Sequence, residues 1–232
     1  MAFVEDLLGE LIQLFPGRFV HIGGDEAPRD RWKTCPKCQA RIKAEGLKNE
    51  AQLQTWFNSR VENFLVRHGR RLIGWDEILE GGLTPGATVM SWRGTAGGLA
   101  AAEAGHDVVM SPTTHCYFDY AQAQGPGEPE CIGGFIPLRT VYAFEPVPPT
   151  LPEPRGKHIL GAQGNVWTEF IWTPQEVEYF AFPRAAALAE VAWAPAESKN
   201  YDDFLTRLEA HCRRLDQLGV NYRRLDAQAR QH

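Results

Sequence analysis

The chain has 232 residues, of which 44% are hydrophobic and 23% charged, and its formal net charge at pH 7 is −5. This composition is typical of a folded globular domain and excludes disordered, collagen-like and coiled-coil chains. The acidic balance, with no block of basic residues, argues against nucleic acid as a partner. No apolar run is long enough to span a membrane.

Taken in chain order, the apolar spacing predicts an α/β fold. A helix over residues 3–14 ends at Pro16 and Gly17, and a strand over 18–22 follows it. The later expected elements are helices over 34–45 and 50–68, strands over 71–75 and 88–92, a helix over 95–104, strands over 107–110 and 159–166, and helices over 174–192 and 201–218. This alternation indicates a parallel sheet. The long segment over 111–156 is typical of a functional loop.

Residues with useful chemistry follow the carboxyl ends of the expected strands. These residues, in strand order, are Asp25 and Glu26, Trp75, Trp92, Tyr117 and Asp119, and finally Trp167 and Glu169. In a barrel of parallel strands these ends share one face, and that face holds the active site. Five strands are too few to close such a barrel.

The sharpest motif is His-Ile-Gly-Gly-Asp-Glu over residues 21–26. Its two glycines let the backbone turn, or let a ligand approach closely. Neighbouring residues of a regular strand point to opposite faces, so Asp25 and Glu26 need a local distortion, or different roles, to serve one ligand. The alternative is a solvated loop whose acids cap a helix. The glycines and the later strand-end aromatic residues favour the functional interpretation.

This motif resembles the active-site signature of family 20 glycoside hydrolases, the β-N-acetylhexosaminidases. Four later segments resemble that family in the same order. They are Gly74-Trp75-Asp76-Glu77-Ile78, Ser91-Trp92-Arg93-Gly94, Tyr117-Phe118-Asp119 and the segment Gly-Ala-Gln-Gly-Asn-Val-Trp-Thr-Glu over 161–169. The five ordered matches cover most of residues 18–195, which makes the resemblance specific.

The resemblance implies a (β/α)8 TIM barrel, of which this chain would hold strands four to eight. Residues 1–200 would form the C-terminal part of the barrel, and 201–232 a C-terminal helix packed on it. The implied reaction is hydrolysis of terminal non-reducing β-linked GlcNAc or GalNAc, in which the substrate's own 2-acetamido oxygen is the nucleophile. The family's substrate-binding Arg lies on an earlier strand. The alternative is therefore a catalytically silent barrel fragment that binds N-acetylated sugars or acts as a subunit.

The resemblance also implies a role for each site residue. Glu26 would protonate the leaving oxygen and then deprotonate water, while Asp25 would hold the acetamido group. Trp75, Trp92 and Trp167 would line the acetamido pocket, Tyr117 would bind the acetamido oxygen, and Asp119 and Glu169 would bind sugar hydroxyls. Taken singly, each Trp is more often a core residue, and an exposed loop acid is the alternative for Asp119 and Glu169.

Five irregularly spaced cysteines argue against a disulfide framework. Cys35-Pro36-Lys37-Cys38 is one pair where structural zinc usually has two, so we expect a helix start there, no metal and no cofactor. The expected partner is an N-acetylhexosamine-containing glycoside, without nucleic acid or membrane. Unpaired edges over 19–22 and 159–166 predict self-association, or a chain that supplies the missing strands. No signal peptide is visible, which favours the cytoplasm for the chain as written and leaves its localisation open.

Overall fold

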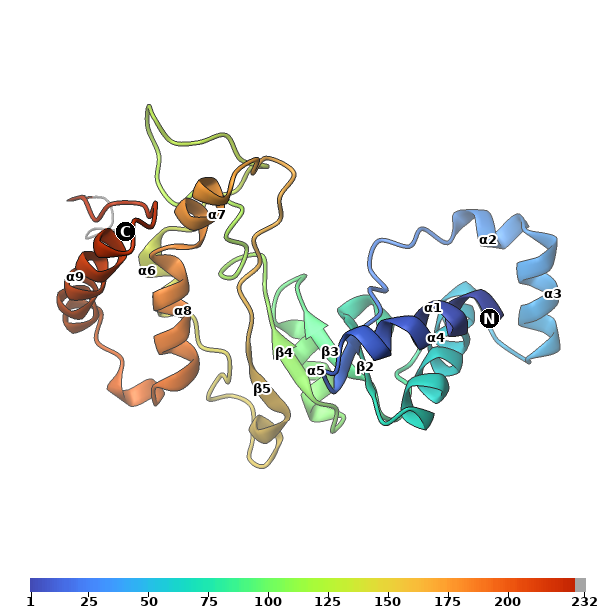
Figure 1. Ribbon diagram of the computed structural model, residues 1–232. Coiled ribbons are helices and arrows are strands. Elements are labelled where there is room, and N and C mark those ends of the chain that lie inside the picture. The colour runs from blue at the N-terminus through green and yellow to red at the C-terminus, as the bar shows by residue number, and fades with distance from the viewer. Residues whose placement is uncertain (228–232) are drawn as a thin grey trace. The chain divides into compact units, whose positions relative to one another are not determined.

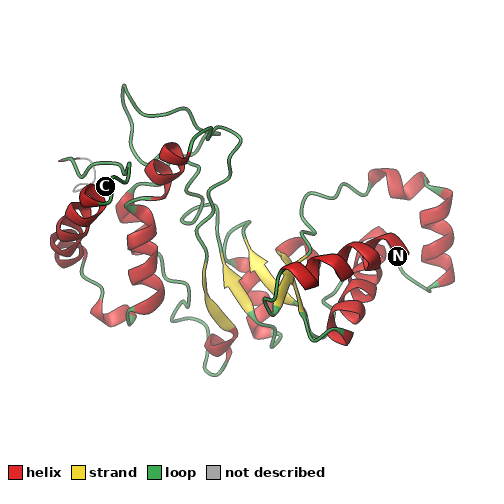
Figure 2. Cartoon of the chain, in the orientation of Figure 1, coloured by secondary structure: helices red, strands yellow, loops and turns green. Residues whose placement is uncertain are grey.

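The computed structural model of the chain describes residues 1–227. The described strands form one sheet in the order β1-β2-β3-β4-β5, and β2 pairs parallel with both β1 and β3 (Figures 1 and 2). The strands are β1 (Phe19–His21), β2 (Arg71–Trp75), β3 (Thr88–Ser91), β4 (Val108–Met110) and β5 (Ile159–Ala162). Sequential order with helical connections is the arrangement of a (β/α) barrel, whereas a doubly wound sheet reverses its strand order.

Helices and short 3-10 turns connect these strands. The helices are α1 (Ala2–Leu14), α2 (Asp30–Thr34), α3 (Pro36–Ala44), α4 (Glu50–Arg67), α5 (Ala96–Glu103), α6 (Leu138–Ala143), α7 (Pro174–Ala181), α8 (Arg184–Trp193) and α9 (Tyr201–Gln217). The 3-10 turns are η1 (Asp76–Leu79), η2 (Arg155–His158) and η3 (Ala196–Ser198). None of the helices among residues 1–227 combines the length and the apolar character needed to cross a bilayer.

Four expected segments differ from those observed. The helix expected over 174–192 is two helices, because Pro183 has no backbone N–H and its ring clashes with the preceding turn. The strand expected over 159–166 ends at Ala162, and Asn165 forms only an isolated bridge to Tyr117. The helix expected over 34–45 is preceded by the separate helix α2, and the loop over 111–156 contains α6.

The chain divides into two compact units. Unit 1 comprises Met1–Val109 and Leu151–Leu160, and unit 2 comprises Met110–Thr150 and the chain from Gly161 onward. These two units do not coincide with the expected domains over residues 1–200 and 201–232. That domain assignment stays a prediction, and residues 228–232 of its second part lie outside the described residues.

The core of unit 1 surrounds β2 and β3. Leu72, Thr88 and Val89 are fully buried, as is usual for parallel strands covered on both faces. Helix α4 packs against β2 and begins at Asn49, whose side chain accepts a hydrogen bond from the Gln52 backbone N–H (3.0 Å). One face of the capped helix α4 is buried, and this face supports β2.

An ion cluster lies at the amino ends of the strands in unit 1. Arg71 opens β2, Asp107 directly precedes β4, and His158 directly precedes β5. The Asp107 carboxylate accepts hydrogen bonds from Arg71 Nη1 (2.7 Å) and pairs with His158 Nδ1 (3.3 Å). Burial opposes ionisation of Asp107, but these partners hold its pKa below the ordinary value. The cluster ties together three strands at the edge remote from the carboxyl ends.

Candidate active site

The turn after β1 departs from strand geometry at the motif over 21–26. Gly23 and Gly24 have φ of 72° and 101°, and Glu26 has φ of 44°. A Cβ on Gly24 would lie 2.8 Å from Ile78 Cγ2, so a side chain has no room there. A left-handed Glu is uncommon, and such strain concentrates at functional sites. The local distortion that Asp25 and Glu26 need is therefore present.

Hydrogen bonds fix the backbone of this turn. The Trp75 N–H donates to Gly23 O (2.9 Å), and Gln54 Nε2 donates to Gly24 O (2.8 Å). The Gly23 N–H donates to His21 Nδ1 (3.1 Å). Burial lowers the pKa of His21, against the opposing charge of Asp25, which favours the neutral ring that can accept this bond. The side chains of Asp25 and Glu26 themselves are exposed.

Trp75 and Trp92 lie together at the ends of β2 and β3. Their ring centroids are 6.5 Å apart in an edge-to-face arrangement, and Trp75 is also 4.9 Å from the His21 ring. Trp92 Nε1 donates to Glu77 Oε2 (2.9 Å), which fixes the orientation of the indole. Trp75 is only 8% exposed and packs with Met90, so it serves the core as well as the strand end.

In unit 2, Tyr117 and Trp167 are neighbours, with ring centroids 6.4 Å apart. They lie on the two segments joined by the Tyr117–Asn165 bridge, in which the Phe118 N–H donates to Asn165 O (2.6 Å). Burial raises the pKa of the Tyr117 hydroxyl. Trp167 is 42% exposed, and Glu169 is also exposed. An aromatic pair with an open face is suited to a sugar ring.

Asp119 differs from the other candidate acids because it is buried. It is 4% exposed, and its Oδ1 atom has no hydrogen-bond partner among the described residues. Burial raises the pKa of Asp119 to about 6, an effect that the charge of Glu169 strengthens and that of Arg184 opposes. A buried acceptor without a partner is rare and is expected to bind something.

Sequence analysis missed Arg184, the first residue of α8, which is fully buried. Its guanidinium donates to the carbonyl oxygens of Phe118 (2.5 Å) and Tyr120 (3.0 Å), the residues on either side of Asp119. It also donates to the carbonyls of Ile136 (3.0 Å) and Phe180 (2.9 Å). The signal for it in the sequence is a charged residue placed directly before a run of alanines in a mostly apolar helix.

The eight candidate residues fall into two groups of four. Asp25, Glu26, Trp75 and Trp92 belong to unit 1, and Tyr117, Asp119, Trp167 and Glu169 belong to unit 2. Within each unit the structure brings aromatic rings and carboxylates into the same neighbourhood. The assignment of all eight to one sugar site stays a prediction.

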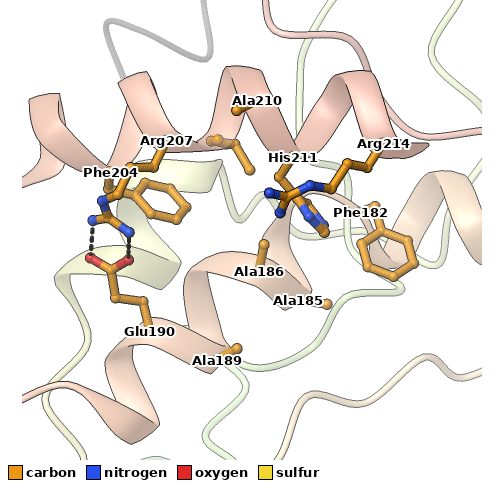
Figure 3. Close-up of a pocket in the computed structure, with 11 residues that line it drawn as sticks. Phe182, Ala185, Ala186, Ala189, Glu190, Phe204, Arg207, Ala210, His211 and Arg214 are labelled. Atoms are coloured by element: carbon orange, nitrogen blue, oxygen red, sulfur yellow. Dashed lines mark hydrogen bonds and ion pairs between the residues drawn. The ribbon is translucent and has the colours of Figure 1, made fainter. Parts of the chain in front are cut away.

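Hollows occur in both units. One of about 430 Å³ in unit 1 has Asp25 on its wall, and Trp32, Trp56 and Phe57 line its apolar part. Another of about 630 Å³ in unit 2 lies between α8 and α9, where Arg207 donates two hydrogen bonds to Glu190 (Figure 3). The second hollow contains none of the eight candidate residues.

The cysteine pair opens α3, as expected for a helix start. Cys35 is the N-cap residue, Pro36 follows at the first helical position, and Cys38 lies in the first turn. Both cysteines are free thiols. No cluster of three or more metal-ligating side chains occurs within residues 1–227. The expected absence of a metal stays a prediction.

Comparison with known proteins decides the family. Residues 1–196 match the family model described as glycosyl hydrolase family 20, catalytic domain. The chain belongs to this family. The resemblance drawn from the motifs is thereby confirmed, and the sheet is part of the (β/α)8 barrel of the family 20 glycoside hydrolases.

Several relatives illustrate the match. The chain is 50% identical over 221 residues to a beta-hexosaminidase of Porphyromonas gingivalis, covering 95% of this chain and 28% of that protein. It is 37% identical to a beta-hexosaminidase of Vibrio furnissii, covering 81% and 31%. The crystal structure of a family 20 exo beta-N-acetylglucosaminidase from Vibrio harveyi with N-acetylglucosamine superposes with a TM-score of 0.87, at 35% identity, covering 96% of this chain and 35% of that one. The chain thus spans about a third of these proteins.

Proposed function

We propose that this chain takes part in the hydrolysis of terminal, non-reducing β-linked GlcNAc or GalNAc by a retaining, substrate-assisted mechanism. The observation that carries the proposal is the turn after β1 in a family 20 chain, where two adjacent carboxylates follow a strand and Glu26 has a left-handed backbone. Most glycoside hydrolases use two carboxyl groups on opposite sides of the scissile bond. Two adjacent acids on one turn suit instead a reaction in which the substrate supplies the nucleophile.

In this mechanism the two acids have different tasks. Glu26 protonates the glycosidic oxygen as it leaves and later removes a proton from the attacking water. Asp25 accepts a hydrogen bond from the acetamido N–H, holds the carbonyl oxygen against the anomeric carbon and stabilises the developing positive charge. Free access to solvent lets Glu26 exchange its proton with water, and the fixed Gly23–Gly24 backbone supports the position of Asp25.

The other candidate residues bind the sugar. Trp75 and Trp92 enclose the acetamido methyl group, and Trp167 supplies a further open indole face. The Tyr117 hydroxyl donates to the acetamido oxygen, because burial keeps it protonated. Asp119 and Glu169 accept hydrogen bonds from ring hydroxyls. The unpartnered Oδ1 of Asp119 supports this role, since a sugar hydroxyl would satisfy it.

A chromogenic β-GlcNAc glycoside tests the proposal in the full chain. Asp25→Asn should lower turnover by about 2 to 4 kcal/mol, roughly 30- to 900-fold, because it removes a charge that faces a developing cation. Glu26→Gln should lower it at least as much. The control Glu103→Gln makes the same chemical change at the end of α5 and should leave turnover unchanged. Unchanged turnover in Glu26→Gln would refute the assignment.

Two small molecules separate this mechanism from direct attack by Asp25. A thiazoline mimic of the cyclised intermediate should inhibit far better than GlcNAc, because it resembles a high-energy species. A substrate with a plain 2-hydroxyl should be nearly inert. Trapping of a covalent sugar–Asp25 adduct with a 2-fluoro sugar, detected by mass spectrometry, would contradict the substrate-assisted mechanism.

The exposure of both Asp25 and Glu26 favours a second candidate, namely binding of N-acetylated sugars without turnover. Catalytic electrostatics is strongest where water is excluded, and these carboxylates lack that environment within the described residues. Binding of the thiazoline without hydrolysis would favour this candidate. Strand β1 is an edge of the sheet and Phe19 is 40% exposed, so self-association remains part of the proposal and size-exclusion chromatography tests it.

A further inference from the structure

A continuous series of hydrogen bonds leads away from the turn that carries Asp25 and Glu26. It begins at Gly24, whose carbonyl oxygen accepts from Gln54 Nε2 (2.8 Å). The Gln54 Oε1 atom accepts from both Nε (3.1 Å) and Nη2 (2.6 Å) of Arg29. Gln54 is buried on α4, so the first link of the series is shielded from water.

The series continues through Glu80 to the end of β3. Glu80 lies between two arginines and accepts from Arg29 Nη1 (2.7 Å) and from Arg93 Nη1 (2.8 Å). Arg93 Nε then donates to Asp76 Oδ1 (2.6 Å). The other oxygen of the buried Asp76 accepts the backbone N–H of Trp92 (3.1 Å) and that of Arg93 (3.2 Å). The series therefore ends on the backbone that carries the Trp92 indole.

Isolated surface ion pairs contribute little, but this series differs from them in two ways. Glu80 uses both oxygens on two different guanidinium groups, which makes a network of charges instead of a pair. Both ends of the network are buried and terminate on backbone atoms of the candidate site. Hydrogen bonds from Arg29 and Arg93 lower the pKa of Glu80, so its carboxylate stays ionised at neutral pH.

We propose that Glu80 is a positioning residue for the reaction. Through Arg29 and Gln54 it fixes the turn of Asp25 and Glu26, and through Arg93 it fixes the backbone of Trp92. This inference rests on the proposed function and deepens it, because it names what keeps the two acids and the acetamido-binding indole in one geometry. The left-handed Glu26 makes such support necessary, since a strained residue persists only where its surroundings over-determine it.

Removing the charge of Glu80 should release both ends of the network together. In Glu80→Gln the guanidinium groups of Arg29 and Arg93 keep their positive charges but lose the shared anion, so they repel each other. In Glu80→Asp the anion remains on a shorter side chain, and the network is partly restored. The matched control is Glu45→Gln, because Glu45 forms an ion pair with Arg41 on α3 (3.0 Å) and has no bond to the network.

Hydrogen exchange and kinetics of the full chain test the inference. Amides over residues 22–29 and over 91–94 should exchange faster in Glu80→Gln, and less so in Glu80→Asp, but not in Glu45→Gln. With the chromogenic glycoside, Glu80→Gln should lower kcat at least tenfold, toward the roughly hundredfold loss that a misplacement of about 1 Å causes, while KM changes less than kcat. Glu80→Asp should recover part of kcat.

The outcomes separate this inference from the proposed function. If the unchanged chain neither turns over the glycoside nor binds the thiazoline, the proposed function fails, and the exchange of the two amide segments still decides whether Glu80 couples them. Faster exchange in only one of the two segments would overturn the inference. An unchanged kcat in a folded Glu80→Gln chain would also overturn it, because it would reduce the network to a purely structural role.

Discussion

Asp25 and Asp119 are both aspartates that follow strands, yet their surroundings are opposite. Asp25 is exposed on a left-handed turn, and a half-exposed network of ion pairs supports the backbone beside it. Asp119 is buried, and one fully buried arginine binds the carbonyls on either side of it. The same side chain is thus positioned by distributed surface charges in unit 1 and by a single buried cation in unit 2.

The two kinds of support predict different responses to salt and to substitution. A network of several partly exposed ion pairs is weakened by salt, because ions in the solvent screen its charges. Removal of a buried guanidinium leaves its four carbonyl acceptors without a hydrogen bond at the same time, because water does not reach them. Burial also changes the chemistry of the acid itself, since it raises the pKa of Asp119 to about 6.

The largest effect is expected from Arg184→Met. The substitution removes a buried charge and leaves the carbonyls of Phe118, Tyr120, Ile136 and Phe180 without their donor. We expect a loss of about 3 to 5 kcal/mol in the free energy of unfolding, measured by urea denaturation followed by circular dichroism. Arg213→Met on the exposed face of α9 is the control and should change it by less than about 0.5 kcal/mol. A loss below about 1 kcal/mol for Arg184→Met would mean that the segment around Asp119 is held by other contacts.

A smaller effect is expected in unit 1 from Gly24→Ala. The new Cβ would lie 2.8 Å from Ile78 Cγ2, and the backbone has φ of 101°, so both packing and conformation oppose it. We expect a loss of roughly 2 to 3 kcal/mol in the free energy of unfolding. The control Gly46→Ala also has positive φ but open space around the new Cβ, and it should cost only about 1 kcal/mol. Equal costs, measured by thermal unfolding, would show that Ile78 yields to the methyl group.

An effect of similar size, a pH dependence, should belong to the buried acid. The pKa of Asp119 is about 6 in the folded chain and 3.8 for the ordinary side chain, so the folded state binds more protons between these values. Its contribution to stability is therefore full below pH 4 and is lost as the pH rises through 6, by up to about 3 kcal/mol. Asp119→Asn should remove this slope.

Urea denaturation at several pH values between 4 and 7 measures that slope. The difference in unfolding free energy between the unchanged chain and Asp119→Asn should decrease as the pH rises. The same comparison with Glu130→Gln, in an exposed loop of unit 2, should show no such trend. A constant difference for Asp119→Asn would show that its carboxyl is solvated in solution.

Local patterns in the sequence were sufficient to place the start of each strand within one residue and to predict the acid-bearing turn. Alternation of apolar runs with glycines placed β2 and β3 within a residue of their observed bounds, and the Gly-Gly pair marked the distortion at Asp25. Pro183 is also a signal for the end of a helix, although the spacing of apolar residues on both sides of it favours one continuous helix. These features are decided by residues close together in the chain.

Other features depend on residues that are far apart, and the sequence alone did not reveal them. Nothing near Glu80 indicates that it would bind Arg29, which lies 51 residues earlier. Likewise Arg184 reaches Phe118 across 66 residues. Long-range polar contacts depend on how the chain packs, whereas periodicity reports only which face of an element is apolar.

The ion cluster of Arg71, Asp107 and His158 has a consequence for the evolution and engineering of this chain. It holds the amino ends of β2, β4 and β5, whereas the residues proposed to bind the sugar lie at or beyond the carboxyl ends of strands. Substitutions at this cluster therefore change stability at positions that lie apart from those proposed to bind the sugar. Natural or engineered variants could strengthen the cluster and keep every residue that is proposed to bind the sugar.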